Sequence, residues 1–215
     1  MVRPSRQAAV IALSLLGGGV LVWHGALASG DRVLEAGFWF EPISFDAPAL
    51  GGPLSAGDLE TIESIARAEL ARAFAGLRIR FSSRRDARYR VRVVQELYDP
   101  RFRRRVGVAG ASRAITGFGG SGAVSFSFVA HGAIGHAPPG AGRSALIVGI
   151  GTGVGRTAVH ELTHELLPKA PIHDSTSIDS YEYASAARRE QYYGHMHWDL
   201  AGPMLVKRLG RTPQK

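Results

Sequence analysis

Cysteine is absent from all 215 residues of the chain. Its absence excludes disulfide bonds, thiolate metal ligands, and a latent state in which a cysteine thiolate blocks a metal. Any metal ion would have to be held by histidine, aspartate or glutamate. With 45% hydrophobic residues, a chain of this length is long enough for one domain with a substantial core.

Acidic residues are scarce, 18 against 26 basic ones, which gives a formal net charge of +8. Eleven arginines lie between positions 78 and 105. They would suit either an anionic partner, such as an envelope surface, or a solvated strand face. The strict alternation of residues 88–93 (RYRVRV) favours the strand face. We expect no nucleic-acid partner, because the start of the chain has the pattern of a secretory signal.

Long hydrophobic runs are also scarce, and one lies near the start of the chain, at residues 8–22. Arg3 and Arg6 precede it, and residues 25–29 (GALAS) follow it. This order is typical of a secretory signal cleaved after Ala28, with an uncleaved amino-terminal anchor as the alternative. We therefore expect residues 1–28 to direct the protein to a secreted or periplasmic location. Residues 29–215 would form a single domain.

The pattern His-Glu-x-x-His at residues 160–164 is the strongest functional signal in the chain. On a helix, His160 and His164 lie one turn apart on the same face, where two imidazoles can bind one zinc ion. Glu161 can then take a proton from the attacking water. The pattern predicts a zinc metallopeptidase site. The alternative is two surface histidines on an ordinary amphipathic helix.

The residues around the motif predict the helix that this chemistry needs. Thr152 or Thr157 can cap the helix, and Pro168 ends it. Apolar residues recur at helical spacing and predict one buried stripe: Val154, Ala158, Leu162 and Leu166.

The remaining patterns predict an α+β domain. An amphipathic helix capped by Ser55 is expected to run to about Ala75, and a closing helix to cover residues 198–209. Strands are expected over residues 38–45, 77–81, 89–97, 123–129 and 145–150.

This element order and the motif helix, residues 158–167 (AVHELTHELL), resemble the catalytic domain of metzincins and other zincin peptidases. The resemblance covers about residues 37–175 and is specific at the five-residue motif. It implies a single zincin-like domain in which a twisted mixed β-sheet backs the active-site helix. It also implies that the edge strand, expected at residues 122–129, holds a peptide or protein substrate in extended form.

The chain departs from the metzincin pattern after the motif. Metzincins carry a third histidine six residues after the second, with a glycine three positions before it. Here the sixth residue is Ala170, and the next glycine is Gly194. The nearest downstream methionine is Met196, so the Met-turn of metzincins is not evident. The third zinc ligand must therefore come from an atypical region.

A catalytic zinc site needs three protein ligands and one open position. Pro168 and Pro171 turn the chain back after the helix, so His173, the first histidine available, is the expected third ligand. Asp174 is an alternative, either as the ligand or as the carboxylate that accepts an N–H from a zinc-bound imidazole. Glu182, at a spacing close to that of the glutamate-type zincins, is a further alternative.

The tail after the motif helix holds four of the six tyrosines. A hydroxyl near the metal would stabilise negative charge on the carbonyl oxygen during amide hydrolysis. Some metzincins place a tyrosine beside the metal, and the resemblance implies Tyr181 in this role. His195 and His197 would suit a second metal on a strand, but a structural place before the closing helix is favoured.

The leading interpretation is a secreted or envelope-associated monomeric zinc endopeptidase that cleaves peptide or protein substrates. Zn²⁺ would be held by His160, His164 and His173. One alternative is a catalytically weak zincin-fold metal-binding or scaffold protein of the cell envelope. Another is a basic envelope-binding protein whose helix carries the motif by chance. The intact Glu161 favours the peptidase, because a non-catalytic site would not need that carboxylate.

Overall fold

The computed structural model describes residues 33–99, 104–105, 108–115, 119–168 and 172–213, so the expected signal at residues 1–28 lies outside the described residues. A five-stranded mixed sheet comprises β1 (Leu34–Phe40), β2 (Ile79–Ser82), β3 (Tyr89–Val94), β6 (Gly110–Ile115) and β7 (Gly119–Ser125). The strands lie in the order β2-β1-β3-β7-β6. β6 runs antiparallel to β7, and the other neighbours are parallel.

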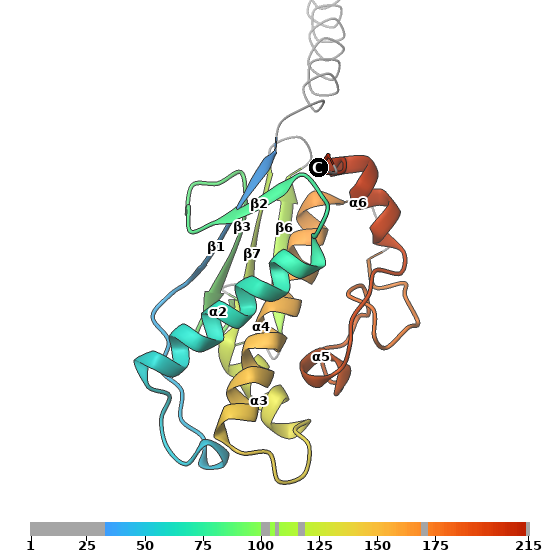
Figure 1. Ribbon diagram of the computed structural model, residues 1–215. Coiled ribbons are helices and arrows are strands. Elements are labelled where there is room, and N and C mark those ends of the chain that lie inside the picture. The colour runs from blue at the N-terminus through green and yellow to red at the C-terminus, as the bar shows by residue number, and fades with distance from the viewer. Residues whose placement is uncertain (1–32, 100–103, 106–107, 116–118, 169–171, 214–215) are drawn as a thin grey trace, which may run out of the picture. The chain divides into compact units, whose positions relative to one another are not determined.

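The helices confirm the α+β class. The two long helices, α2 (Ala56–Ala73) and α4 (Arg143–Leu166), lie against the same face of the sheet (Figure 1). Among the described residues, no helix is both long and apolar enough to cross a membrane. The shorter elements are η1 (Pro48–Leu50), β4 (Tyr98–Asp99), β5 (Arg104–Arg105), α3 (Phe126–Gly135), α5 (Glu190–Tyr193) and α6 (Ala201–Leu209).

Helix α2 forms where the sequence predicts it. The Ser55 hydroxyl accepts a hydrogen bond from the Asp58 amide at 3.1 Å, and the Asp58 carboxylate accepts one from the Ser55 amide at 2.8 Å. This reciprocal cap satisfies two amides that the first turn leaves free. The predicted inward face is buried at Ile62, Ala66 and Leu70. The closing helix is also confirmed, as α6.

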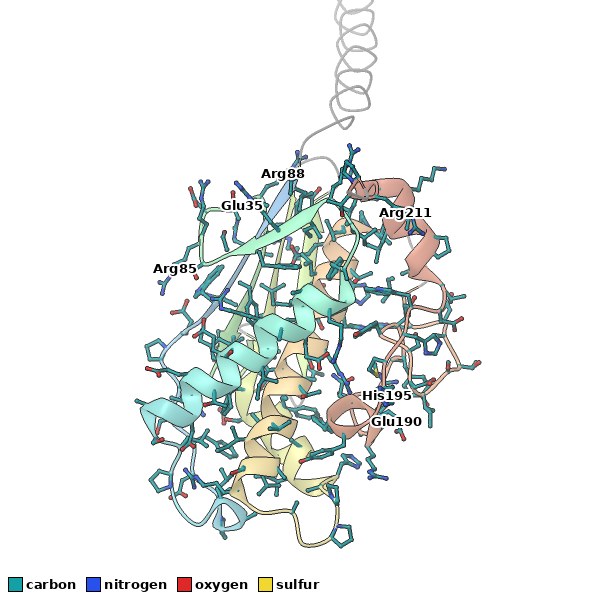
Figure 2. The ribbon with its side chains drawn as sticks, in the orientation of Figure 1. Glu35, Arg85, Arg88, Glu190, His195 and Arg211 are labelled. Atoms are coloured by element: carbon teal, nitrogen blue, oxygen red, sulfur yellow. The ribbon has the colours of Figure 1, made fainter. Side chains whose placement is uncertain are left out.

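Strand β3 confirms the alternation predicted for the arginine-rich segment. Tyr89, Val91 and Val93 are buried, whereas Arg92 is exposed on the opposite face. Several arginines from this segment form surface ion pairs, such as Arg80 with Glu35 at 3.0 Å. Figure 2 shows Glu35, Arg85 and Arg88 at the same end of the sheet. Arg101 and Arg103 lie outside the described residues.

The strand predicted over residues 145–150 is wrong, because these residues form the first part of helix α4. A short apolar run has no period that separates a buried strand from a helix buried on several sides. Helix α4 begins at Arg143 after Gly142, so Thr152 and Thr157 lie inside it and do not cap it. The rest of the helix prediction is confirmed: it ends at Leu166, and the predicted apolar stripe is buried.

The strand predicted over residues 123–129 forms only as far as Ser125, as the end of β7, and its predicted place at the edge is wrong. Helix α3 begins at Phe126, and β7 lies inside the sheet between β3 and β6. The edge beside the motif helix is β6, which comes from the glycine-rich stretch that precedes β7. Local alternation shows which face of a strand is buried, but it does not show which strands become neighbours.

The motif helix is held against α2 at very short range. A Cβ atom at Gly155 would lie 2.5 Å from the Glu69 Cβ, so only glycine fits at this contact. An ion pair between the buried side chains of Arg156 and Glu69, 3.4 Å apart, crosses the same interface. Arg156 also donates to the Gly194 carbonyl at 2.8 Å, which ties the tail of the chain to α4.

Candidate active site

Three histidines converge at the end of helix α4. The Nε2 atoms of His160 and His164 are 3.2 Å apart, and each lies close to the Nε2 of His173, at 2.8 and 3.1 Å. Three nitrogen ligands about 2.0–2.1 Å from one zinc ion would lie about 3.3 Å apart in a tetrahedral site. Among the described residues, this is the only group of three or more potential ligands that converges in this way.

The protonation of His160 suits it to bind a metal. Its Nδ1 lies 2.8 Å from the backbone carbonyl oxygen of Tyr181. A carbonyl oxygen only accepts, so Nδ1 carries the proton and the Nε2 lone pair faces the other two rings. Burial lowers the pKa of His160 to about 4, and burial together with repulsion from His173 lowers that of His164 to about 4. Both imidazoles are therefore neutral at pH 7.

The third histidine is positioned by its own backbone. His173 has a φ of 92°, which is uncommon for a residue other than glycine. Its amide donates to the Glu182 carbonyl at 3.1 Å, next to the Tyr181 carbonyl that orients His160. One short segment, residues 181–182, therefore holds two of the three histidines.

Glu161 faces the sheet from the same helix. Its side chain is buried, and burial raises its pKa to about 7, while a hydrogen bond with Ser112 of β6 acts in the opposite direction. A Cβ atom at Gly110 would clash with Glu161 Oε1, so the glycine lets β6 approach this carboxylate. A carboxylate with a pKa near the working pH can both accept and return a proton.

Glu165, which the sequence did not single out, lies one turn beyond Glu161. It is buried, accepts a hydrogen bond from the Arg90 amide at 3.2 Å, and its Oε1 has no partner among the described residues. Burial raises its pKa to about 8, so it is mostly protonated at pH 7. A Cβ atom at Gly120 would lie 2.5 Å from its Cγ. In the sequence, the alternating Gly120 and Gly122 could have indicated that a side chain packs closely against β7 at this point.

Comparisons with known proteins give no family. No protein-family model, curated protein or solved structure matches this chain. The functional argument therefore rests on the geometry of the site.

The alternative ligands lie elsewhere. Asp174 is exposed and does not belong to the histidine cluster, which consists of His160, His164 and His173. Glu182 is fully buried. Its carboxylate accepts hydrogen bonds from the backbone amides of Asp199, at 3.2 Å, Leu200, at 2.9 Å, and Ala201, and from the hydroxyl of Ser180. Glu182 therefore caps the amino-terminal end of α6, where a negative charge is favourable.

Replacing Glu182 by glutamine is expected to destabilise the fold by about 1–3 kcal/mol and to leave metal binding unchanged. Glutamine offers one acceptor oxygen where the carboxylate offers two, and it places an N–H₂ group against backbone amides. Denaturant unfolding and metal analysis of the same samples measure both effects. Glu60→Gln, at an exposed position on α2, serves as the control. Loss of metal from a folded Glu182→Gln protein would restore Glu182 as a ligand.

The geometry does not place the Tyr181 hydroxyl in the expected oxyanion role. The Tyr181 ring packs against Trp198, with ring centroids 4.8 Å apart, and its hydroxyl interacts with Arg72 of α2. The contribution of Tyr181 to the site is its backbone carbonyl, because the hydroxyl is engaged at α2. The sequence singled out Tyr181, whose carbonyl does contact His160, but it could not show that the side chain turns toward α2.

Of the two tail histidines, His197 supports the site through backbone pairing. Tyr181 donates its amide to the His197 carbonyl at 3.0 Å, and the His197 amide donates to the Asp179 carbonyl at 3.0 Å. His195 is exposed and lies near Glu190 at α5 (Figure 2). Neither histidine belongs to a converging ligand group among the described residues, which favours the structural interpretation.

A cavity of about 720 Å³ opens beside the histidines and Glu161. One wall is the edge strand β6, through Gly110, Ala111 and Ser112. The opposite wall comes from residues 183–188 and from Gln191 at α5. The cavity therefore joins the histidine cluster to an exposed sheet edge and to the atypical tail.

Proposed function

We propose that the protein is a zinc-dependent peptidase of zincin type. The observation that carries the proposal is the convergence of the Nε2 atoms of His160, His164 and His173 next to the buried Glu161. The mixed sheet behind the motif helix is consistent with the zincin resemblance. A secreted or periplasmic location and a monomeric state stay predictions.

The donor set suits zinc better than calcium or magnesium. Neutral imidazole nitrogens are typical zinc ligands, whereas calcium and magnesium take oxygen ligands. The Tyr181 carbonyl fixes the tautomer of His160, as partners of zinc-bound imidazoles usually do. When bound, zinc would polarise the scissile carbonyl and lower the pKa of a water molecule toward 7.

Glu161 would perform the proton transfers. As the water oxygen attacks the carbonyl carbon, the Glu161 carboxylate accepts a proton from that water. Glu161 then delivers the proton to the amide nitrogen as the carbon–nitrogen bond breaks, which releases a carboxylic acid and an amine. Burial of this carboxyl group, which raises its pKa, favours its holding the proton between the two steps.

The edge strand β6 would hold the substrate. β6 pairs on one side with β7, and its residues Gly110 to Ser112 line the cavity. An extended peptide can add to such an edge through main-chain hydrogen bonds. This arrangement would present a peptide bond to Glu161 without requiring a particular side chain at every position.

Metal analysis combined with peptide cleavage tests the proposal. The purified chain is expected to contain one zinc per molecule, and a His160→Ala/His164→Ala variant to contain none. A denatured protein substrate should be cut by the zinc-loaded protein, with the products mapped by mass spectrometry. Chelation should stop the cleavage, and added zinc should restore it.

Two outcomes would contradict the proposal in different ways. Zinc without cleavage, equal in the wild type and in Glu161→Gln, would favour the metal-binding scaffold. No zinc in the folded wild type would leave the motif as a chance pattern on a structural helix.

A further inference from the structure

Arg188 is a buried cation in the wall of the cavity. Its side chain is 8% exposed, and it lines the cavity together with Thr157 and Gln191. The guanidinium is held rigidly by carbonyls of the tail: Nη2 donates to the Ser180 carbonyl at 3.0 Å, and Nη1 donates to the Ile178 carbonyl. The centroid of the Tyr183 ring lies 4.7 Å from the guanidinium carbon, Cζ, of Arg188.

The charge of Arg188 has no carboxylate in direct contact, although the carboxylates of Glu190 and Asp179 act on it from a longer distance. Among the described residues, no carboxylate oxygen forms an ion pair with its guanidinium, and its buried Nε–H has no acceptor. The remaining side-chain partner is the neutral Gln191, whose Oε1 accepts from Nη2 at 3.2 Å. A buried cation without a counter-charge costs free energy, so this arrangement calls for an explanation.

The cavity leaves room for a ligand group beside this cation. Its wall next to Arg188 carries small side chains, Ala184, Ala186 and Ala187. Among the described residues, Glu161 is the only carboxylate that lines the cavity. A second carboxylate, brought in by a ligand, would therefore meet a positive charge that no carboxylate of the cavity wall contacts.

We propose that the Arg188 end of the cavity is a subsite for a substrate carboxylate. A ligand carboxylate would supply the missing counter-charge and an acceptor for the guanidinium, whose orientation is already fixed. The inference rests on the proposed peptidase function and names its substrate class: peptides with an aspartate, a glutamate or a free carboxyl terminus close to the cleaved bond.

Equilibrium binding tests the subsite without requiring hydrolysis. The probes are acetylated, amidated alanine peptides that carry one central glutamate or one central glutamine, and a glutamine peptide with a free carboxyl terminus. Their dissociation constants are measured with the full chain carrying Glu161→Gln, which prevents turnover. The glutamate peptide or the free-terminus peptide is expected to bind about 10–100-fold more tightly than the amidated glutamine peptide. Which of the two binds tighter identifies the source of the carboxylate.

Two variants remove the positive charge in different ways. Arg188→Gln deletes the cation, and Gln191→Glu places a carboxylate against it with little change in shape. Both are expected to reduce the preference for a carboxylate to less than threefold. Arg189→Gln removes an exposed neighbouring charge and should keep the preference. Gln191→Glu keeps the test valid if Arg188→Gln does not fold.

The outcomes separate the subsite from the peptidase proposal. Equal binding of all peptides by the parent protein, or a preference that survives in a folded Gln191→Glu protein, overturns the subsite. A carboxylate preference that depends on Arg188, in a protein that never cleaves peptides, supports the subsite and overturns the peptidase function.

Discussion

Replacing Glu161 by glutamine is expected to lower kcat for peptide hydrolysis by about 10²–10⁴-fold, the usual contribution of general acid–base catalysis. Glutamine keeps the size of the side chain and a hydrogen-bonding oxygen for Ser112, but it cannot take a proton from water. Zinc content should not change, because Glu161 is not one of the three converging ligands. Steady-state kinetics and metal analysis on the same preparation measure both quantities.

Glu165→Gln is the matched control for this variant. Glu165 is also buried, lies one turn along the same helix, and has its pKa raised to about 8 by burial. Because glutamine resembles the protonated acid that prevails at pH 7, this substitution should change kcat by less than tenfold. A similar fall in both variants would mean that Glu161 acts through packing and not through proton transfer.

Replacing His173 by alanine is expected to weaken zinc binding at least about 100-fold. Loss of a partner that only orients a ligand typically costs 10–100-fold in metal affinity, and loss of the ligand itself should cost more. His173 supplies one of three Nε2 atoms that lie 2.8–3.2 Å apart, so its removal leaves two protein ligands. Competition with a chromophoric chelator at fixed pH measures the dissociation constant.

Asp174→Ala provides the control for the third ligand. Asp174 is adjacent in sequence but exposed, so the substitution should change zinc affinity by less than threefold. A large loss of affinity in Asp174→Ala, with little change in His173→Ala, would reverse the assignment. Circular dichroism of each variant shows whether the fold is retained.

Local patterns in the sequence were sufficient for the parts of the site that lie on one helix. The spacing of His160 and His164, the neighbouring Glu161 and the apolar stripe follow from the 3.6-residue period of an α-helix. The same kind of reasoning found the Ser55 cap and the alternation of β3, because caps and strand faces depend on residues close together in the chain.

Local patterns failed where the environment was decided by distant segments. Residues 145–150 were predicted as a strand but lie in α4, where Leu146, Ile147, Gly149 and Ile150 are buried. The edge strand of the sheet was predicted one strand too far along the chain, because strand neighbours are chosen by long-range pairing. His173 could be named as a third ligand from the sequence, but its alternatives were separated by contacts from residues 181–182.

The sequence by itself therefore determined the chemistry predicted for this protein, since two histidines and a glutamate within one helical turn are a local arrangement. Only the tertiary structure decided what surrounds that chemistry. It brought His173 to the cluster, turned Glu182 to the end of α6, made β6 the edge, and left the guanidinium of Arg188 beside the cavity without a carboxylate in contact. The physical reason is that these features depend on contacts between residues far apart in the chain.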